Sequence, residues 1–290
     1  MPSISSKILL LKLLILTIAF SCLSLNLNAT EKITNRNNNP LIFGFLPLHN
    51  TKSLIRRFKP LVDYLADQLN QSIRIETAPN YREFVSRTLN KRYDIVLTAP
   101  HFYYLANHRS NYEAIVKVNA PSLKAIIVAH KKSNITRLQD LKSKQLSTPS
   151  KLSLASVLIR HTLRNAGLNP DNDLTLIATP NHNSSLKSAS LRLTDAAGLM
   201  TVPFNRVSNR IKSQMVELVK TQGTPHMPIA ISPELNAKKS AQIQQILLDI
   251  KNTKNGQTLL NHLSWKNGFT KVIPGEYDSL AWVIQEIDIE

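Results

Sequence analysis

The sequence predicts an α/β protein of two lobes, each a mostly parallel sheet with helices on both faces. Three observations predict this fold class. Short apolar runs of strand length alternate with amphipathic stretches of helical period along residues 41–290. The alternation occurs in two successive sets, and the second set begins near Pro121. Further helical segments follow the second set, so the chain is expected to return to the first lobe through crossing strands. The expected boundaries are residues 41–122 plus 227–290 for lobe I and residues 123–226 for lobe II.

The first set opens with the apolar run 41–46, a predicted strand that Pro47 ends. Apolar residues at helical spacing follow at Leu54, Phe58, Leu61, Val62, Leu65 and Leu69. Pro60 lies inside this stripe and is expected either to kink the helix or to begin its second half. Residues 95–97 form a predicted buried strand. Pro100 then suits the first position of a helix, where its missing N–H costs nothing.

The second set repeats the pattern. Its predicted strands are 125–129, 145–147, 174–178, 197–202, 216–219 and 229–231. A helix is expected around Leu154–Leu163, where Gly167 can terminate it. Leu186, Ala189 and Leu193 indicate another helix, and the chain is expected to end in helices around 243–250 and 280–287.

The N-terminus has the layout of a secretory signal peptide. Residues 8–20 are almost wholly apolar, Lys7 precedes them, and small and polar residues follow up to Ala29. We therefore expect residues 1–29 to be a signal peptide and the protein to be periplasmic; the alternative is an uncleaved membrane anchor. Cys22 is the single cysteine, which excludes an intrachain disulfide and leaves lipoprotein anchoring open.

The charge balance favours an anionic partner. The formal net charge is +17, and the predicted signal peptide contributes only two lysines to it. The basic residues are spread along the chain and are not interleaved with aromatic residues, so we expect no nucleic-acid binding. Removal of the leader would leave roughly 260 residues, enough for two modest cores.

The usual sequence signatures of enzymes are absent. The chain contains no H-E-x-x-H, no G-x-S-x-G and no Walker loop, and its seven glycines do not cluster. Asp94 and Asp195 are better placed to brace strand ends than to act as a catalytic pair. We therefore expect no enzyme activity, no metal site and no cofactor.

Four segments in order carry a resemblance to a known family. They are Phe43-Gly44-Phe45-Leu46-Pro47, the run Tyr93–Ala106, the run Ile135–Lys144, and His182 followed by Asp195-Ala196-Ala197. Across residues 41–290 the chain resembles the periplasmic phosphate/phosphite/phosphonate-binding proteins of ABC transporters, which have the type 2 periplasmic-binding-protein fold.

The resemblance implies a solute-binding protein that captures a small oxyanion between its lobes for an ABC importer. Its expected partners are a small anionic ligand and an ABC permease, and the protein is expected to be a monomer. An alternative from another class is a sensory module that partners a membrane kinase or cyclase. A third is a site that has decayed into a protein-interaction surface.

The resemblance also implies site residues around the start of the helix at Pro100. The run that contains Thr98 is the family's strand and helix start, and Tyr103 matches its ligand-contacting tyrosine. Independently of the family, the backbone N–H groups of His101 and Phe102 would lie in the first turn, where a helix attracts anions. The alternative for Tyr103 is packing between elements.

The loop before the next helix departs from the family pattern. The family has a Ser-Thr-Ser-Gly run here, of which only Ser153 matches by type. Ser150 and Ser153 are candidate ligand contacts or simple helix caps, and Lys151 is a candidate cation in place of the lost hydroxyls. His182 matches a position where the family often has a histidine that lines the cleft, and the alternative is an ordinary surface or capping residue.

Two further predictions concern the ligand. His49 and Asn50 lie in the first strand–helix loop, where open α/β sheets bind ligands, and the alternative for each is a solvated turn. Met200 stands where some aminoalkylphosphonate binders have an aspartate for the ligand amine. An amine-bearing ligand is therefore not expected.

Overall fold

The computed structural model describes residues 39–48 and 50–287. The predicted signal peptide, Cys22 and His49 lie outside the described residues. No described helix is both long enough and apolar enough to cross a membrane.

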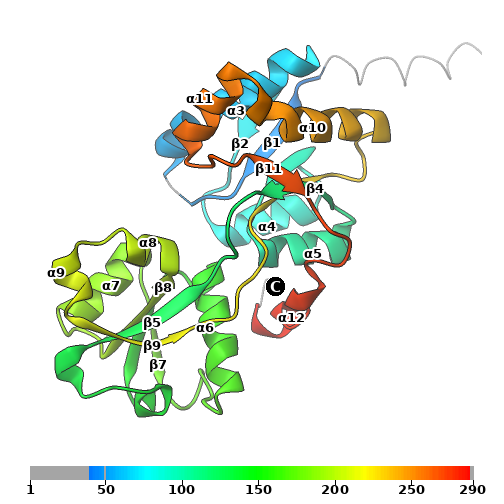
Figure 1. The fold of residues 1–290 in the computed structure, drawn as a ribbon. Helices are drawn as coiled ribbons and strands as arrows, with labels where there is room; N and C mark the ends of the chain where they lie inside the picture. Colours follow the sequence, from blue (N-terminus) through cyan, green and yellow to red (C-terminus); the bar gives the residue numbers. More distant parts are fainter. Residues whose placement is uncertain (1–38, 49, 288–290) are drawn as a thin grey trace, which may run out of the picture. The chain divides into compact units, whose positions relative to one another are not determined.

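The first of two sheets has six strands in the order β11-β4-β10-β3-β1-β2 (Figure 1). Their bounds are β1 Leu41–Phe45, β2 Ile73–Glu76, β3 Ile95–Leu97, β4 Glu113–Val118, β10 Pro228–Ile231 and β11 Phe269–Lys271. Strand β1 pairs in parallel with β2 and β3, whereas β10 pairs antiparallel with both β3 and β4. Strands β1 to β4 therefore share one direction, and β10 and β11 oppose it.

The second sheet has five strands in the order β7-β6-β8-β5-β9. Their bounds are β5 Ala125–His130, β6 Gln145–Thr148, β7 Thr175–Ala178, β8 Ala196–Met200 and β9 Met215–Lys220. Only β5 runs against the others, because it pairs antiparallel with β8 and β9 while β6 pairs in parallel with β7 and β8.

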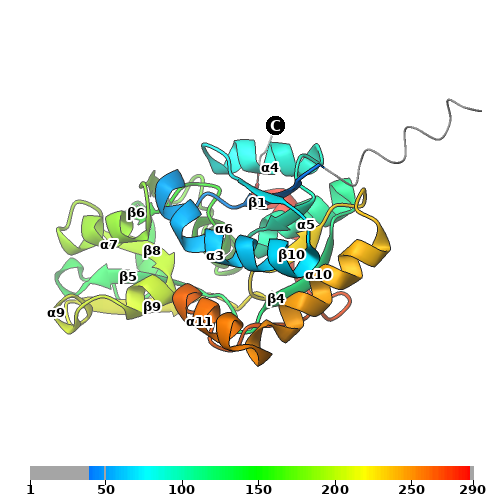
Figure 2. The same ribbon diagram turned by 90° about the horizontal axis from the view of Figure 1, so that it is seen from above.

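Helices cover both faces of the first sheet, which we call lobe I (Figure 2). One face carries α3 Thr51–Leu69, α10 Ala237–Asp249 and α11 Lys254–Leu263; the other carries α4 Tyr81–Leu89, α5 Pro100–Ser110 and α12 Val283–Glu286. Successive residues of β3 show the division, because Ile95 and Leu97 pack with the first group and Val96 packs with the second. Each face therefore has its own apolar core.

The second sheet, which we call lobe II, is covered in the same way. Helix α6 Leu154–Asn165 packs on one face; α7 His182–Ser190, α8 Thr201–Asn205 and α9 Asn209–Lys212 pack on the other. Short 3₁₀ turns complete the described chain at Lys131–Ser133, Leu138–Leu141, Ile250–Asn252 and Asp278–Leu280. The architecture is the α/β two-lobe fold that the sequence predicts.

Two local predictions need correction. Leu193 does not extend the helix of Leu186 and Ala189, because α7 ends at Ser190 and the Leu193 side chain is 70% exposed. The helix expected over 280–287 is a 3₁₀ turn followed by the four-residue α12. Pro60, in contrast, lies within the 19 residues of α3 without ending it.

The two aspartates brace strand starts, as the sequence predicts. The Asp94 carboxylate, just before β3, accepts a hydrogen bond of 2.7 Å from the backbone N–H of Ile42 in β1. In lobe II the Asp195 carboxylate, just before β8, accepts one of 2.7 Å from the N–H of Gln145 in β6. In each sheet, an aspartate directly before one strand thus binds the backbone of the neighbouring parallel strand.

Among the described residues, three segments link the lobes, in addition to a contact between α5 and the loop before α6. Residues 119–124 and 221–227 run side by side in opposite directions, with Leu123 bridged to Thr224. The third link is the C-terminal segment, where the buried Glu286 carboxylate accepts hydrogen bonds from Arg160 and Arg164 of α6. The predicted boundaries after residues 122 and 226 fall in the first two links, and as limits of moving lobes they stay a prediction.

Candidate ligand-binding site

A cavity of about 1150 Å³ is lined by residues of both lobes. Lobe I contributes Pro47 and Leu48 after β1 and Asn80 and Tyr81 at the start of α4. Lobe II contributes the loop between β6 and α6, residues along the whole of α7, and residues of the α8–α9 region. None of the described lining residues is an aspartate or a glutamate. The cavity therefore offers donors and cations without a carboxylate to repel an anion.

Three helices begin at this cavity. Asn80 caps α4, Ser153 caps α6 and Asn181 caps α7, and each cap side chain accepts a hydrogen bond from an N–H three residues later. A cap engages only one of the free N–H groups in a first turn, and the helix start keeps a partial positive charge. Helix starts at a common cavity form a site that suits an oxyanion.

The serines of the α6 loop bond mainly to one another. The Ser153 hydroxyl accepts from the N–H of Ser156 at 3.2 Å and donates to the Ser156 hydroxyl at 3.0 Å. The Ser156 hydroxyl in turn donates to the carbonyl of Pro149 at 2.9 Å. Ser150 and Ser153 both line the cavity, while Lys151 is exposed and is not among its lining residues. Because the Ser153 proton is engaged, the backbone of α6 is the better donor from this loop.

His182 lies at the start of α7 and lines the cavity. Its Nδ1 accepts a long hydrogen bond of 3.4 Å from the N–H of Met200, and burial lowers its pKa to about 4. The ring is therefore neutral at pH 7. Since Nδ1 accepts, the proton resides on Nε2, which makes Nε2–H the group that can donate to a bound oxygen.

His101 lies in the first turn of α5 and Thr98 lies between β3 and α5; both are buried, but neither lines the cavity. The His101 Nε2–H donates to the carbonyl of Leu152 in the α6 loop at 3.0 Å, so this bond joins lobe I to lobe II. Burial lowers the pKa of His101 to about 4. Within the described chain, His101 Nδ1 and Thr98 Oγ1 are buried without a hydrogen-bond partner. Such atoms are costly unless a water or a ligand satisfies them.

Tyr103 and Asn50 are placed by other contacts. The Tyr103 hydroxyl accepts from the N–H of Ala114 at 3.1 Å, and its ring packs edge-on against Tyr277 with ring centres 4.7 Å apart. The structure does not bring Tyr103 to the cavity, which favours the packing alternative. Asn50 is exposed and caps α3 by accepting from the N–H of Ser53 at 2.9 Å.

Tyr81 is a cavity residue that the sequence reasoning missed. Burial raises its pKa, so its hydroxyl stays protonated and can donate. The signal was present, because Asn80 followed by Glu83 has the cap spacing of a helix start.

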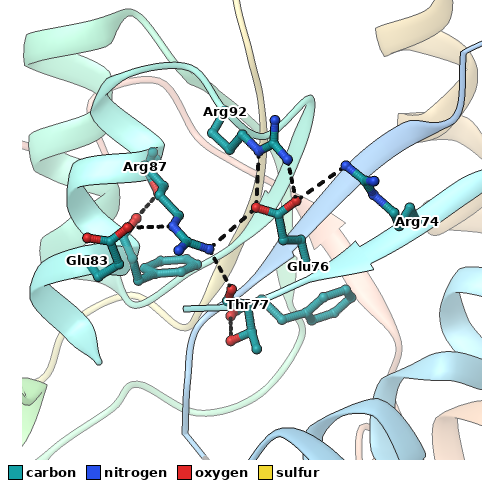
Figure 3. Close-up of polar contacts among 9 residues, drawn as sticks. Arg74, Glu76, Thr77, Glu83, Arg87 and Arg92 are labelled. Carbon is teal, nitrogen blue, oxygen red and sulfur yellow. Dashed lines mark hydrogen bonds and ion pairs between the residues drawn. The ribbon is translucent and has the colours of Figure 1, made fainter. Parts of the chain in front are cut away.

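A cluster of ion pairs fixes the helix that carries Tyr81 (Figure 3). Both oxygens of the Glu76 carboxylate accept from Arg92 at 3.1 Å. Arg87 of α4 donates to Glu83 at 2.7 Å and to the carbonyl of Thr77 at 3.1 Å. These bonds hold α4 against the end of β2, and the start of α4 is thereby set at the cavity.

The family follows from the sequence comparison. The model of the ABC transporter, phosphonate, periplasmic substrate-binding proteins matches residues 43–277. The chain belongs to this family. It is therefore a substrate-binding protein of an ABC transporter and not an enzyme, and membership implies an extracytoplasmic location.

Among the described residues, no group of three or more metal-ligating side chains could hold a metal ion.

Solved structures share the fold at low identity. A binding protein component of an ABC phosphonate transporter from Pseudomonas aeruginosa has a TM-score of 0.71 and 15% identity, over 85% of this chain and 86% of that one. PhnD1 from Prochlorococcus marinus, in complex with methylphosphonate, has a TM-score of 0.74 and 18% identity, over 87% of this chain and 100% of that one. A Xanthomonas citri protein bound to ATP has a TM-score of 0.73 and 17% identity, over 84% and 96%.

Proposed function

We propose that this protein captures a phosphonate, or a similar small phosphorus oxyanion, in the cavity and delivers it to an ABC importer. The observation that carries the proposal is the start of three helices at one cavity whose described lining contains no carboxylate. Family membership and the methylphosphonate complex of PhnD1 support the same ligand class.

The donors suit a phosphoryl group. The first turns of α6 and α7 supply backbone N–H groups, His182 supplies Nε2–H, and Tyr81 supplies a hydroxyl. A phosphonate has three oxygens that accept hydrogen bonds and no donor when it is fully ionised. A neutral His182 donates to such an oxygen without needing a charged partner.

Closure of the lobes belongs to the proposal. The paired linkers 119–124 and 221–227 are the segments at which a hinge would bend. A ligand that contacts both lobes favours the closed arrangement, and closure gives the transporter a surface to recognise.

The direct test is binding of the mature protein to a panel of anions. The panel holds phosphate, phosphite, methylphosphonate, sulfate, ATP and a simple carboxylate, and binding is followed by thermal shift and then by calorimetry. A ligand at one hundred times its Kd adds about 2.7 kcal/mol to the free energy of unfolding. A clear response to one phosphorus oxyanion supports the proposal, and silence across the panel refutes it.

A variant pair locates the binding. His182→Ala removes a cavity donor and should weaken binding of the responding anion by about tenfold or more. His262→Ala removes an exposed histidine of α11 and should leave the affinity unchanged. If His182→Ala and His262→Ala bind the responding anion equally well, the anion does not bind beside His182.

Uptake separates the importer from the sensory alternative. A strain that lacks this gene should lose growth on the responding compound as the only phosphorus source, and the wild-type gene should restore it. Normal uptake together with a lost transcriptional response to the compound would instead identify a sensor.

A further inference from the structure

One wall of the cavity is cationic. Lys187 of α7, Arg206 directly after α8 and Arg210 of α9 line the same cavity as Ser153 and His182. All three side chains belong to lobe II and are exposed. They therefore form a group beside the helix starts, which we call the cation wall.

The cation wall has no ion-pair partner among the described residues. In the described part of the chain, none of its three side chains forms an ion pair or donates a hydrogen bond. Arg160 and Arg164 of the same lobe, in contrast, pair with Glu286 and Asp171. Three cations left unpaired on the wall of a cavity attract an anion from solution.

Lobe I adds a fourth cation nearby. Arg57 of α3 is partly buried and donates to the carbonyl of Leu263 at 2.7 Å. Burial lowers the pKa of Arg57, and the positive charge of Arg206 lowers it further.

The cation wall lies apart from the helix starts within the cavity. Lys187 lies five residues beyond His182 on α7, which is about 7.5 Å along the helix at 1.5 Å per residue. The open cavity of about 1150 Å³ has room for a ligand that reaches from the helix starts to the cation wall.

We propose that the cation wall is a second anion subsite, and that the protein selects organophosphonates that carry another acidic group several bonds from phosphorus. This inference rests on the proposed function, because the helix starts and His182 hold the phosphonate end. The cation wall then binds the far carboxylate or phosphate. A ligand of this kind contacts both parts of the cavity, whereas methylphosphonate reaches only one.

The test compares two ligands of equal length. Phosphonobutyrate carries a terminal carboxylate, and butylphosphonate ends in a methyl group. Calorimetry on the mature protein should give phosphonobutyrate about tenfold tighter binding than butylphosphonate. The double variant Arg206→Gln/Arg210→Gln should bind phosphonobutyrate and butylphosphonate with equal affinity, because it loses affinity for phosphonobutyrate alone.

A matched variant controls for net charge. Lys131→Gln/Lys132→Gln removes two exposed cations of lobe II, neither of which lines the cavity. It should keep the wild-type preference for phosphonobutyrate. A preference that falls equally in Lys131→Gln/Lys132→Gln and in Arg206→Gln/Arg210→Gln would mean that the ligand is attracted by the overall charge of the protein, and it would overturn the subsite.

The outcomes separate the two proposals. If wild type binds both ligands equally, the second subsite is refuted while the phosphonate site stands. If neither those ligands nor the oxyanion panel binds, the proposed function fails and this inference fails with it.

Discussion

Acidification should destabilise this protein through His101, and the size of the effect follows from its burial. The side chain is 1% exposed, and burial lowers its pKa from the ordinary 6.5 to about 4. The unfolded chain therefore binds a proton between pH 6.5 and 4 that the folded chain does not. The neutral ring contributes its full stability above pH 6.5. This contribution decreases as the pH falls from 6.5 to about 4, and below about pH 4 it decreases no further. At pH 4 the loss is about 3 kcal/mol.

Comparison with a variant that cannot titrate isolates this loss. Gln can donate to the carbonyl of Leu152 as His101 does, but it takes up no proton. Free energies of unfolding are measured in urea at pH 7.5 and pH 4 for wild type and His101→Gln. The fall between the two pH values should be smaller in the variant by about 3 kcal/mol, whatever the substitution costs at neutral pH.

Other histidines supply the control. Buried His182 and His226 also have pKa values lowered to about 4, so His101→Gln should still lose some stability in acid. His262→Gln, at an exposed position, should lose as much as wild type does. The reasoning is refuted if His101→Gln and wild type lose the same amount.

Two further substitutions probe packing and the C-terminal link. Gly44→Ala should destabilise the protein by about 1–3 kcal/mol or more, because its Cβ would lie 2.4 Å from the buried ring of Tyr93; a melting temperature equal to wild type would contradict this. Glu286→Gln should lower the free energy of unfolding by about 2 kcal/mol, since the carboxylate is 3% exposed and bonds to Arg160 and Arg164; unchanged urea denaturation would show that the pairing adds nothing.

Elements with a strong local pattern were predictable from sequence. The apolar stripe of α3 from Leu54 to Leu65 is buried throughout, because one helix face packs on the sheet. Strand β4 gave no such signal. Its place in the sheet depends on pairing with β10 and β11, which lie more than 100 residues later in the chain. A local sequence pattern cannot predict pairings between such distant segments. The helix α11, which the sequence reasoning did not assign, likewise packs against the distant α3.

The site was predictable only in part, for a related reason. His182 and Ser153 begin helices, and a helix start can be recognised from a few neighbouring residues. Helix α5 is buried nearly all round, so its pattern could not show which way Tyr103 points. Arg206 and Arg210 lie on or beside helices of only five and four residues, which are too short for periodicity to reveal.

The position of β10 orders the folding of the chain. It lies between β3 and β4 in the first sheet, yet it follows the whole of the second sheet in sequence. When the chain is made or exported from its N-terminus onwards, the second sheet has all five of its described strands once the chain up to Lys220 is available. The first sheet must keep a gap at its centre until Ile231 arrives, with two apolar edges open to other chains. Lobe I is therefore begun first and completed last. A binding partner that shields the open strand edges during export would act on lobe I.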